Sequence, residues 1–243
     1  MTETAPRGPA GPAISFVVPA YNESAFLAST IGAIRRSADP LGRVYEIVVA
    51  DDASTDGTGA LAESLGARVV RCANRQIAGT RNAGALAAHG DILIFVDADT
   101  TVNEAVIRAA LEAIERGAVG GGCRVDWEEP VQLPWRIFVW TLMTLFGTVH
   151  WAAGSFLFCT RAAFVAAGGF DERLYAAEEI WMSRALKRHG RFVVLRQRVV
   201  TSARKLRDHS SFHVLRVLGS IVLRGPRSVR KRKGLELWYD QRG

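Results

Sequence analysis

Short apolar, β-branched runs alternate with helix-like stretches along the first half of this chain of 243 residues. Four such runs predict buried strands, at residues 14–18 (ISFVV), 46–50 (EIVVA), 67–70 (ARVV) and 92–96 (ILIFV). The stretches between and after them predict helices at residues 24–36, 57–65, 77–88 and 103–116. Strands and helices in alternation favour a mostly parallel sheet with helices on both faces. We therefore predict an α/β, Rossmann-like fold in a single domain.

Charge is distributed unevenly along the chain. Residues 1–183 hold 14 Lys and Arg against 21 Asp and Glu, whereas residues 184–243 hold 17 against 3. A strongly basic end indicates an anionic partner, which membrane lipid, a phosphorylated substrate or nucleic acid would each provide, although a solvated basic face is the alternative. The Pro- and Gly-rich residues 1–12 predict a disordered leader and lack the pattern of a signal peptide.

The cysteine content fits a reducing compartment. Cys72, Cys123 and Cys159 are odd in number and have no metal-binding spacing, so we interpret them as reduced packing residues of a cytoplasmic protein.

Acidic side chains follow three of the predicted strands, in the segments 19–23 (PAYNE), 51–58 (DDASTDGT) and 97–100 (DADT). Ligands of open α/β sheets bind beyond the carboxyl ends of the strands, so these segments are expected to face one site. Two ionised carboxylates one residue apart, as at Asp97 and Asp99, repel each other unless a cation lies between them. Turn and capping chemistry is the alternative, and it is the interpretation we favour for Asp56-Gly57 and for Asn103 as a helix N-cap.

Two common phosphate-binding motifs are missing from the sequence. No G-x-G-x-x-G follows the first predicted strand, and no G-x-x-x-x-G-K-[ST] occurs anywhere. A phosphate-bearing ligand would therefore need a metal ion or basic side chains.

Four segments together resemble the family 2 glycosyltransferases of GT-A fold: VVPAYNE (17–23), VVADDASTDGT (48–58), GTRNAGALAAHGDILIFVDADT (79–100) and GGFDERLYAAEEIWMSRALKRHGR (168–191). The likeness extends over roughly residues 14–205. It implies a metal-dependent, hexosyltransferase-type enzyme that moves a sugar from a nucleotide-diphosphate sugar to an acceptor hydroxyl with inversion. The Q-x-x-R-W signature of processive members is absent, so the chain resembles the non-processive bacterial type.

The resemblance also assigns residues to the donor. It places Pro19, Ala20, Tyr21 and Glu23 against the nucleoside, and either Asp51 or, preferably, Asp52 against the base. Arg81 is expected to contact the donor. The D-x-D segment of Asp97, Ala98 and Asp99 is expected to hold the diphosphate and a divalent cation, Mn²⁺ or Mg²⁺, with Asp99 and Asp97 as metal ligands. Both ions prefer oxygen ligands. Residues 13–205 would form the catalytic domain, with a nucleotide-sugar half at about 13–100 and an acceptor half at about 101–205.

The catalytic base is expected in a Glu-Asp pair that begins a helix in this family. Here the pair is Glu178-Glu179, so Glu179 takes the position of the base. The side chain is one methylene longer than Asp, which leaves Glu178 as an alternative base. A further alternative is that both residues only complement the dipole at the start of a helix.

The C-terminal part suggests contact with anionic groups. Arg204 and Lys205 are expected to approach the diphosphate, with surface basic residues as the alternative. Residues 206–243 form a basic, amphipathic extension that predicts peripheral attachment to an anionic membrane, consistent with a lipid-linked or membrane-proximal acceptor. The aromatic stretch 135–158 predicts either an acceptor pocket or a buried helix and core strand.

Two other classes of function are alternatives to an active glycosyltransferase. A catalytically inactive GT-A-like protein that binds nucleotide sugars fits the Glu-Glu departure from the family pattern. A nucleic-acid-binding protein fits only the basic tail, because the body of the chain lacks a recognisable binding motif, and no nucleic-acid partner is expected.

Overall fold

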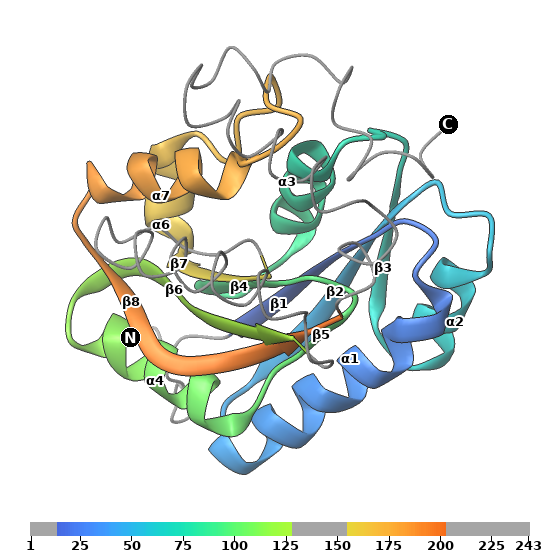
Figure 1. Ribbon diagram of the computed structural model, residues 1–243, viewed down its shortest axis with the longest axis horizontal. Coiled ribbons are helices and arrows are strands. Elements are labelled where there is room, and N and C mark those ends of the chain that lie inside the picture. Colours follow the sequence, from blue (N-terminus) through green and yellow to red (C-terminus); the bar gives the residue numbers. More distant parts are fainter. Residues whose placement is uncertain (1–13, 128–154, 203–243) are drawn as a thin grey trace, which may run out of the picture.

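A computed structural model of the chain describes residues 14–127 and 155–202. These residues form an eight-stranded sheet with the strand order β3-β2-β1-β4-β7-β6-β8-β5, flanked by helices (Figure 1). The strands are β1 (Ile14–Ala20), β2 (Tyr45–Asp52), β3 (Arg68–Cys72), β4 (Ile92–Val96), β5 (Thr100–Thr101), β6 (Ala118–Trp127), β7 (Phe156–Thr160) and β8 (Arg191–Thr201). The helices are α1 (Ser24–Ala38), α2 (Thr58–Ser64), α3 (Ile77–Ala87), α4 (Glu104–Glu115), α6 (Arg161–Ala167) and α7 (Glu178–Lys187), with a 3₁₀ turn at Asp39–Leu41.

The four predicted strands form one parallel half of the sheet. β1 pairs with β2 and β4, and β2 pairs with β3, all in parallel. β1 and β2 run further than predicted, because the ladder continues through Ala20 opposite Asp51 and Asp52 opposite Cys72. Pro19, Ala20, Asp51 and Asp52 therefore end these strands instead of following them.

The other half of the sheet is mixed. β7 runs antiparallel to β4 and β6, β8 runs parallel to β6, and the short β5 runs antiparallel to β8. Glycines allow the close contacts of β6: a side chain at Gly121 would collide with the Val193 carbonyl and the Phe158 ring. The sheet as a whole is thus mixed, and its parallel character is concentrated in the first half.

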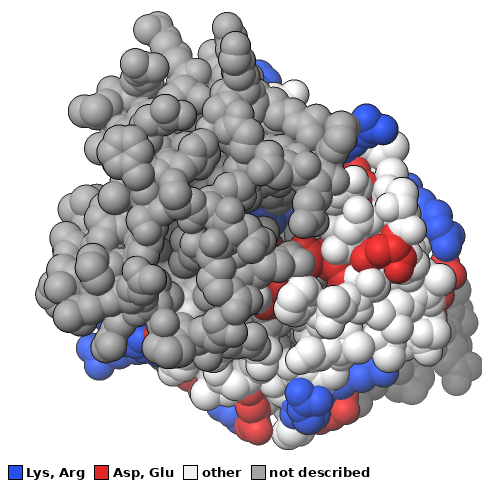
Figure 2. Space-filling view, turned by 45° about the vertical axis from the view of Figure 1, so that its right-hand side comes forward, with Lys and Arg blue, Asp and Glu red and all other residues white. Residues whose placement is uncertain are grey.

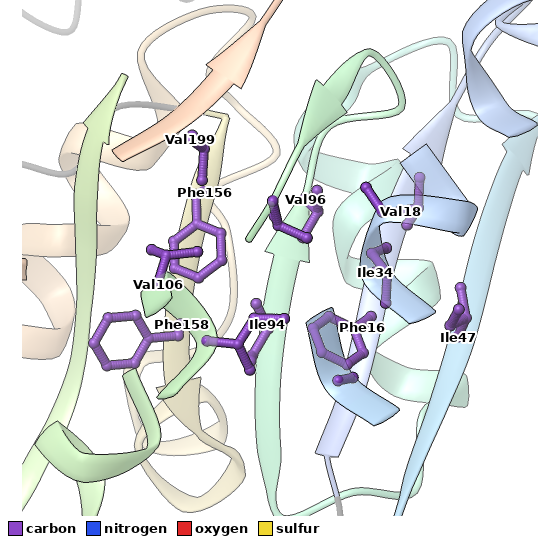
Figure 3. Close-up of a cluster of buried hydrophobic side chains, with 14 of the residues drawn as sticks. Phe16, Val18, Ile34, Ile47, Ile94, Val96, Val106, Phe156, Phe158 and Val199 are labelled. Atoms are coloured by element: carbon purple, nitrogen blue, oxygen red, sulfur yellow. The ribbon is translucent and has the colours of Figure 1, made fainter. Parts of the chain in front are cut away.

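Helices cover both faces of the sheet, as predicted, and each face buries its own apolar cluster. Side chains from β1, β2, β4 and β7 pack with α1, α2 and α4 on one face (Figure 3), which includes Phe16, Ile34, Ile94 and Phe156. On the other face, Val17, Val48 and Phe95 pack with α3, α6 and α7, among other residues. Alternation along each strand decides the face, because successive side chains point to opposite sides of a sheet.

Some predicted features lie outside the described residues. These are the leader 1–12, most of the aromatic stretch 135–158, Arg204, Lys205 and the extension 206–243. The end of the aromatic stretch is described, and its Phe156–Thr160 is the core strand β7. Within the described ranges, no helix is long and apolar enough to cross a membrane. Cys72, Cys123 and Cys159 are free, as predicted, and the last two are buried.

Candidate active site

The alternation of side chains separates the two aspartates that end β2. Asp52 lies on the face covered by α3, as Val48 does, whereas Asp51 lies on the opposite face with Val49. The Asp51 carboxylate accepts a hydrogen bond from the Ser54 backbone N–H at 3.1 Å, and a side chain at Gly59 would collide with it. Asp51 thus fixes the turn before α2.

Asp52 fixes the start of α3 instead. Its carboxylate is fully buried and accepts the backbone N–H groups of Arg75, at 2.8 Å, and Gln76, at 3.2 Å. Gln76 is the N-cap residue of α3. A carboxylate at a helix N-terminus is stabilised by the unpaired N–H groups and by the helix dipole. Of the two candidates for the nucleotide base, Asp52 is therefore the one that shares a face with α3.

The loops after β1 and β2 hold each other. The Asn22 side chain accepts the Thr55 N–H at 2.8 Å, and the Glu23 N–H donates to the Thr58 hydroxyl at 2.9 Å. Asp56 accepts N–H groups from both loops, those of Ser24 and Thr58, at 3.0 Å each. Partial burial raises the pKa of Asp56, but these bonds outweigh burial and lower the pKa to about 2.

The turn expected at Asp56 is confirmed by these bonds. The N-cap expected at Asn103 is confirmed as well, because its side chain accepts the Val106 N–H at 3.0 Å. Of the predicted nucleoside contacts, Pro19 and Ala20 are buried at the end of β1, while Tyr21 and Glu23 are half-buried in the loop that follows.

Arg81 of α3 joins the D-x-D segment to the acidic pair of α7. Its guanidinium donates to Asp97 Oδ1 at 2.9 Å and to Glu178 Oε1 at 2.6 Å. The Arg81 side chain is 4% exposed and also lies over the Phe170 ring, 5.4 Å from its centre. Burial alone lowers the pKa of Arg81, but Asp97, Glu178 and Glu179 together raise it, so the residue stays charged.

Glu179 differs from its neighbour Glu178. The Glu178 side chain is 5% exposed and paired with Arg81, whereas Glu179 is half-buried in the first turn of α7. Burial first, and then the charges of Glu178 and Asp97, raise the pKa of Glu179 to about 8, against the opposing effect of Arg81. A carboxyl group with a pKa moved toward neutrality suits proton transfer at physiological pH.

Asp99 lies against the end of β8. Its carboxylate accepts the Thr201 hydroxyl at 3.3 Å, and its backbone carbonyl accepts the Ser202 N–H at 3.2 Å. Thr201 also bonds to Thr100 in the short β5–β8 ladder. No local pattern predicts a role for Thr201, since its contact with Asp99 depends on pairing between distant segments. Ala98 is buried and contributes its carbonyl to a bond from Thr30 at 2.7 Å.

The donor atoms and charge of this region fit a divalent cation. Arg81 is one positive charge facing Asp97, Glu178 and Glu179, which leaves negative charge in excess. Arg81 bonds to the Asp97 carboxylate through one oxygen, Oδ1, and the Asp97 side chain is 25% exposed. Within the described parts of the chain, no three His, Cys, Asp or Glu residues gather as a metal-binding cluster. Two carboxylates are sufficient where substrate phosphates complete the metal shell.

Acidic side chains gather near the middle of the face shown in Figure 2, whereas Lys and Arg lie mostly around its edge.

The segment that leads to α7 is held by two side-chain amides, those of Gln76 at the N-cap of α3 and of Asn82 within α3. Neither residue was predicted to matter, because their partners lie 98 and 88 residues away.

Comparison with known proteins supports the resemblance. The family model described as "Glycosyl transferase family 2" matches residues 15–168, which include the D-x-D segment but end before Glu178. The succinoglycan biosynthesis protein ExoO of Rhizobium meliloti is 35% identical over 129 residues, which cover 51% of this chain and 36% of that protein. An undecaprenyl-phosphate 4-deoxy-4-formamido-L-arabinose transferase of Shewanella sediminis is 34% identical over 93 residues, covering 35% of this chain and 28% of that one. The chain thus matches only about a third of the length of these relatives.

Solved glycosyltransferases share the fold. The mannosyltransferase PcManGT of Pyrobaculum calidifontis, in complex with GDP-Man and Mn²⁺, superimposes with a TM-score of 0.67 at 21% identity, covering 90% of this chain and 64% of that chain. The glucosyl-3-phosphoglycerate synthase of Mycobacterium tuberculosis, with Mn²⁺ and UDP, has a TM-score of 0.60 at 23% identity and covers 89% and 81%.

Proposed function

The chain belongs to glycosyl transferase family 2 and has the GT-A fold, and from this premise we propose that it transfers a sugar from a nucleotide-diphosphate sugar to an acceptor hydroxyl with inversion. One observation carries the proposal: Arg81 ties Asp97 of the D-x-D segment directly to Glu178, the neighbour of Glu179. A single buried side chain thereby connects the group expected to hold the donor diphosphate with the group expected to activate the acceptor.

Asp97 and Asp99 are the residues that would hold a divalent cation. When bound, such a cation neutralises charge that develops on the departing nucleoside diphosphate. Mn²⁺ accompanies the nucleotide in both solved structures described above, which supports this assignment by analogy. The surplus of carboxylates around Arg81 is the support from this chain itself.

Glu179 would act as the base. It takes the proton of the acceptor hydroxyl while the hydroxyl oxygen attacks the anomeric carbon from the side opposite the diphosphate. The bond between this carbon and the diphosphate oxygen then breaks, which inverts the anomeric configuration. Glu178 is the poorer candidate, because its carboxylate is buried in an ion pair with Arg81.

The remaining donor contacts are proposed from where the residues lie in the fold. Asp52, on the α3 face, is proposed for the nucleotide base, with Pro19, Ala20, Tyr21 and Glu23 beside the nucleoside. Ser202 is bonded to Asp99, and Arg204 and Lys205 follow it by only two and three residues. We propose that these two basic side chains approach the diphosphate, a contact for which arginine is well suited.

The acceptor is proposed to be lipid-linked or close to a membrane. Relatives named as undecaprenyl-phosphate transferases support this class, as does the basic extension 206–243. Attachment of that extension to anionic lipid would keep the enzyme near such an acceptor.

A donor screen tests the proposal. Purified protein is mixed with UDP-glucose, GDP-mannose and other nucleotide sugars, with and without Mn²⁺, and unfolding temperature and nucleoside diphosphate release are recorded. A ligand that binds only the native state raises the unfolding temperature. We expect one donor to raise the unfolding temperature, and to do so mainly when Mn²⁺ is present. Asp99→Asn should reduce this rise in temperature and lower turnover by about 10²-fold, in line with lost electrostatic stabilisation.

The role of Glu179 is tested separately. Glu179→Gln should keep the donor affinity but lower turnover by about 10²–10⁴-fold, the usual contribution of a general base. Glu178→Gln is the matched variant one residue away, and it keeps the carboxylate at 179. Wild-type turnover in Glu179→Gln would remove this residue from the role, whereas donor binding without any turnover in the wild type would favour the inactive GT-A-like protein.

A further inference from the structure

The amide N–H donors of Gln76, the N-cap residue of α3, and of Asn82 within α3 are all used by protein groups of the segment before α7. Gln76 is buried, and its amide nitrogen donates to the Glu172 and Leu174 carbonyls, the latter at 2.8 Å. The Asn82 amide nitrogen donates to the Phe170 carbonyl at 2.9 Å and to the Glu172 carboxylate at 2.8 Å. A primary amide has only two N–H donors, so neither side chain has one left for a ligand.

The orientation of both amides is determined by their partners. The Asn82 oxygen accepts the Phe170 N–H at 2.9 Å while its nitrogen donates to the Phe170 carbonyl, so a flipped amide would lose both bonds. Gln76 faces two carbonyl oxygens, which only its nitrogen satisfies. Gly169 permits the approach, because its φ is +72° and a side chain there would press against the Asn82 oxygen.

The N-terminus of α3 is also bound to the end of β2, where the nucleotide is proposed to lie. The Gln76 backbone N–H is bound by the buried Asp52 carboxylate at 3.2 Å, while the Gln76 side chain binds the segment that leads to α7. One residue therefore touches the end of β2 through its backbone and the approach to Glu178-Glu179 through its side chain. Figure 1 shows α3 between β2 and β3 on one side and the turn before α7 on the other.

The residues bound by Gln76 and Asn82 lie close in sequence to the acidic pair of α7. Leu174 precedes Glu178 by four residues, and the segment between them includes Ala177, whose φ of +60° is unusual for alanine. A non-glycine residue keeps this conformation only when its surroundings hold it. The Gln76 and Asn82 bonds on one side and the Arg81–Glu178 pair on the other supply that restraint.

From this geometry we infer that Gln76 and Asn82 are positioning residues, which fix the segment 170–178 so that α7 presents Glu179 at the donor site. The inference rests on the proposed function, because it concerns the placement of the proposed base. It differs from a donor-binding role, since the N–H donors of both amides bind protein groups.

The test separates binding from turnover. Gln76→Met removes both hydrogen bonds at similar size, and Gln76→Glu keeps the shape but places a carboxylate against two carbonyls. Asn82→Asp keeps the acceptor for the Phe170 N–H, loses the donated bonds and places a second carboxylate beside that of Glu172. Gln197→Met makes the same chemical change at the half-buried glutamine of β8 and serves as the control. Binding of UDP and GDP with Mn²⁺, sugar-nucleotide turnover and amide hydrogen exchange of residues 170–180 are measured.

We expect each α3 variant that folds to bind nucleotide as wild type does and to turn over about 10–100-fold more slowly, the scale of a slightly misplaced catalytic group. Amide exchange in residues 170–180 should be faster, and Gln197→Met should match wild type in all measurements. Unchanged turnover and exchange in Asn82→Asp and the Gln76 variants would overturn the inference, and so would an equal loss of nucleotide binding and turnover. A wild-type protein that turns over no donor would instead reject the proposed function, and exchange would then still report whether the amides hold the segment.

Discussion

Two acidic pairs meet at Arg81, and the protein builds them differently. At the end of β4, Asp97 is partly exposed and bonded to Arg81, while Asp99 is held by Thr201 of β8. At the start of α7, Glu178 is buried against Arg81 and Glu179 is only half-buried. The first pair is spaced by one residue in a turn closed by the Thr100 N–H and the Asp97 carbonyl. The second pair is adjacent on a helix.

This difference in spacing has a chemical consequence. Consecutive residues of a helix point about 100° apart, so neighbours such as Glu178 and Glu179 face different surroundings. One carboxylate can then neutralise Arg81 while the next keeps a raised pKa. The D-x-D pair instead has its members supported from separate elements, α3 and β8, with oxygen atoms suited to a shared cation. Chemically identical groups thus acquire different surroundings from the backbone elements that carry them.

The largest effect on stability and turnover is expected from substitution of Arg81, which bonds to one member of each acidic pair. Arg81→Met leaves the buried Glu178 carboxylate without its cation and removes the partner of Asp97. Removal of one partner from a buried ion pair commonly costs about 3–5 kcal/mol. We expect the free energy of unfolding, measured with urea, to fall by about that amount and turnover to be lost.

Two further variants sharpen this prediction. Arg161→Met removes a half-buried arginine that donates to the Gly90 and Ala85 carbonyls, and it should cost less, about 1–3 kcal/mol. Arg81→Met combined with Glu178→Leu should recover part of the stability, since the buried charge is then removed as well. Equal losses in Arg81→Met and Arg161→Met would contradict the view that Arg81 acts chiefly through charge.

The first half of the fold was predictable because its strands carry a strong local signal. Runs such as 14–18 and 92–96 are almost continuously apolar and β-branched, which few other structures accommodate. β6 was not predicted, since glycines such as Gly120 and Gly121 disfavour a strand. They are needed here because β7 and β8 pack closely against them. Strand ends were missed for a similar reason: pairing with β3 carries β2 through Asp52, whatever its own propensity.

The sequence indicated which residues to consider for the candidate site, but not the contacts between them. The carboxylates stood out through their position after apolar runs. The bonds of Arg81 to Asp97 and Glu178 connect residues 16 and 97 positions apart, and nothing in the local sequence specifies the second. The ion pair gives Glu178 and Glu179 different surroundings, and which of them acts as the base stays a prediction. Whether Arg81 also contacts the donor stays a prediction.

A pH titration tests the difference within the α7 pair. The pKa of Glu179 is about 8 in the folded protein, against about 4.3 for an unfolded glutamate. The folded state therefore binds this proton more tightly, so the stabilising contribution is complete below about pH 4 and is lost as the pH rises through about 8. Glu179→Gln removes this dependence. We expect it to gain about 1–3 kcal/mol of unfolding free energy over wild type between pH 5 and pH 9.

The measurement is urea unfolding of both proteins at several pH values without metal. Titrations common to both proteins cancel in the difference. Parallel stability curves from pH 5 to pH 9 would show that Glu179 is not held in a perturbed environment, and would weaken its assignment as the base.

The smallest effect is expected from glycine substitution of two alanines with a positive φ, one beside the acidic pair of α7 and one beside Asp52. Ala177 precedes the α7 pair with a φ of +60°, and Ala53 follows Asp52 with a φ of +58°. Each alanine pays about 1–2 kcal/mol for this left-handed conformation, which glycine adopts freely, but glycine also loses more entropy on folding. Ala177→Gly and Ala53→Gly should therefore change stability alike, by less than about 1 kcal/mol. Their effects on function should differ: Ala177→Gly loosens the placement of Glu179 and should lower turnover a few-fold at unchanged nucleotide affinity, while Ala53→Gly should act on affinity for UDP or GDP with Mn²⁺. The same response in both variants would mean that the donor side and the base side of the site are not separately held.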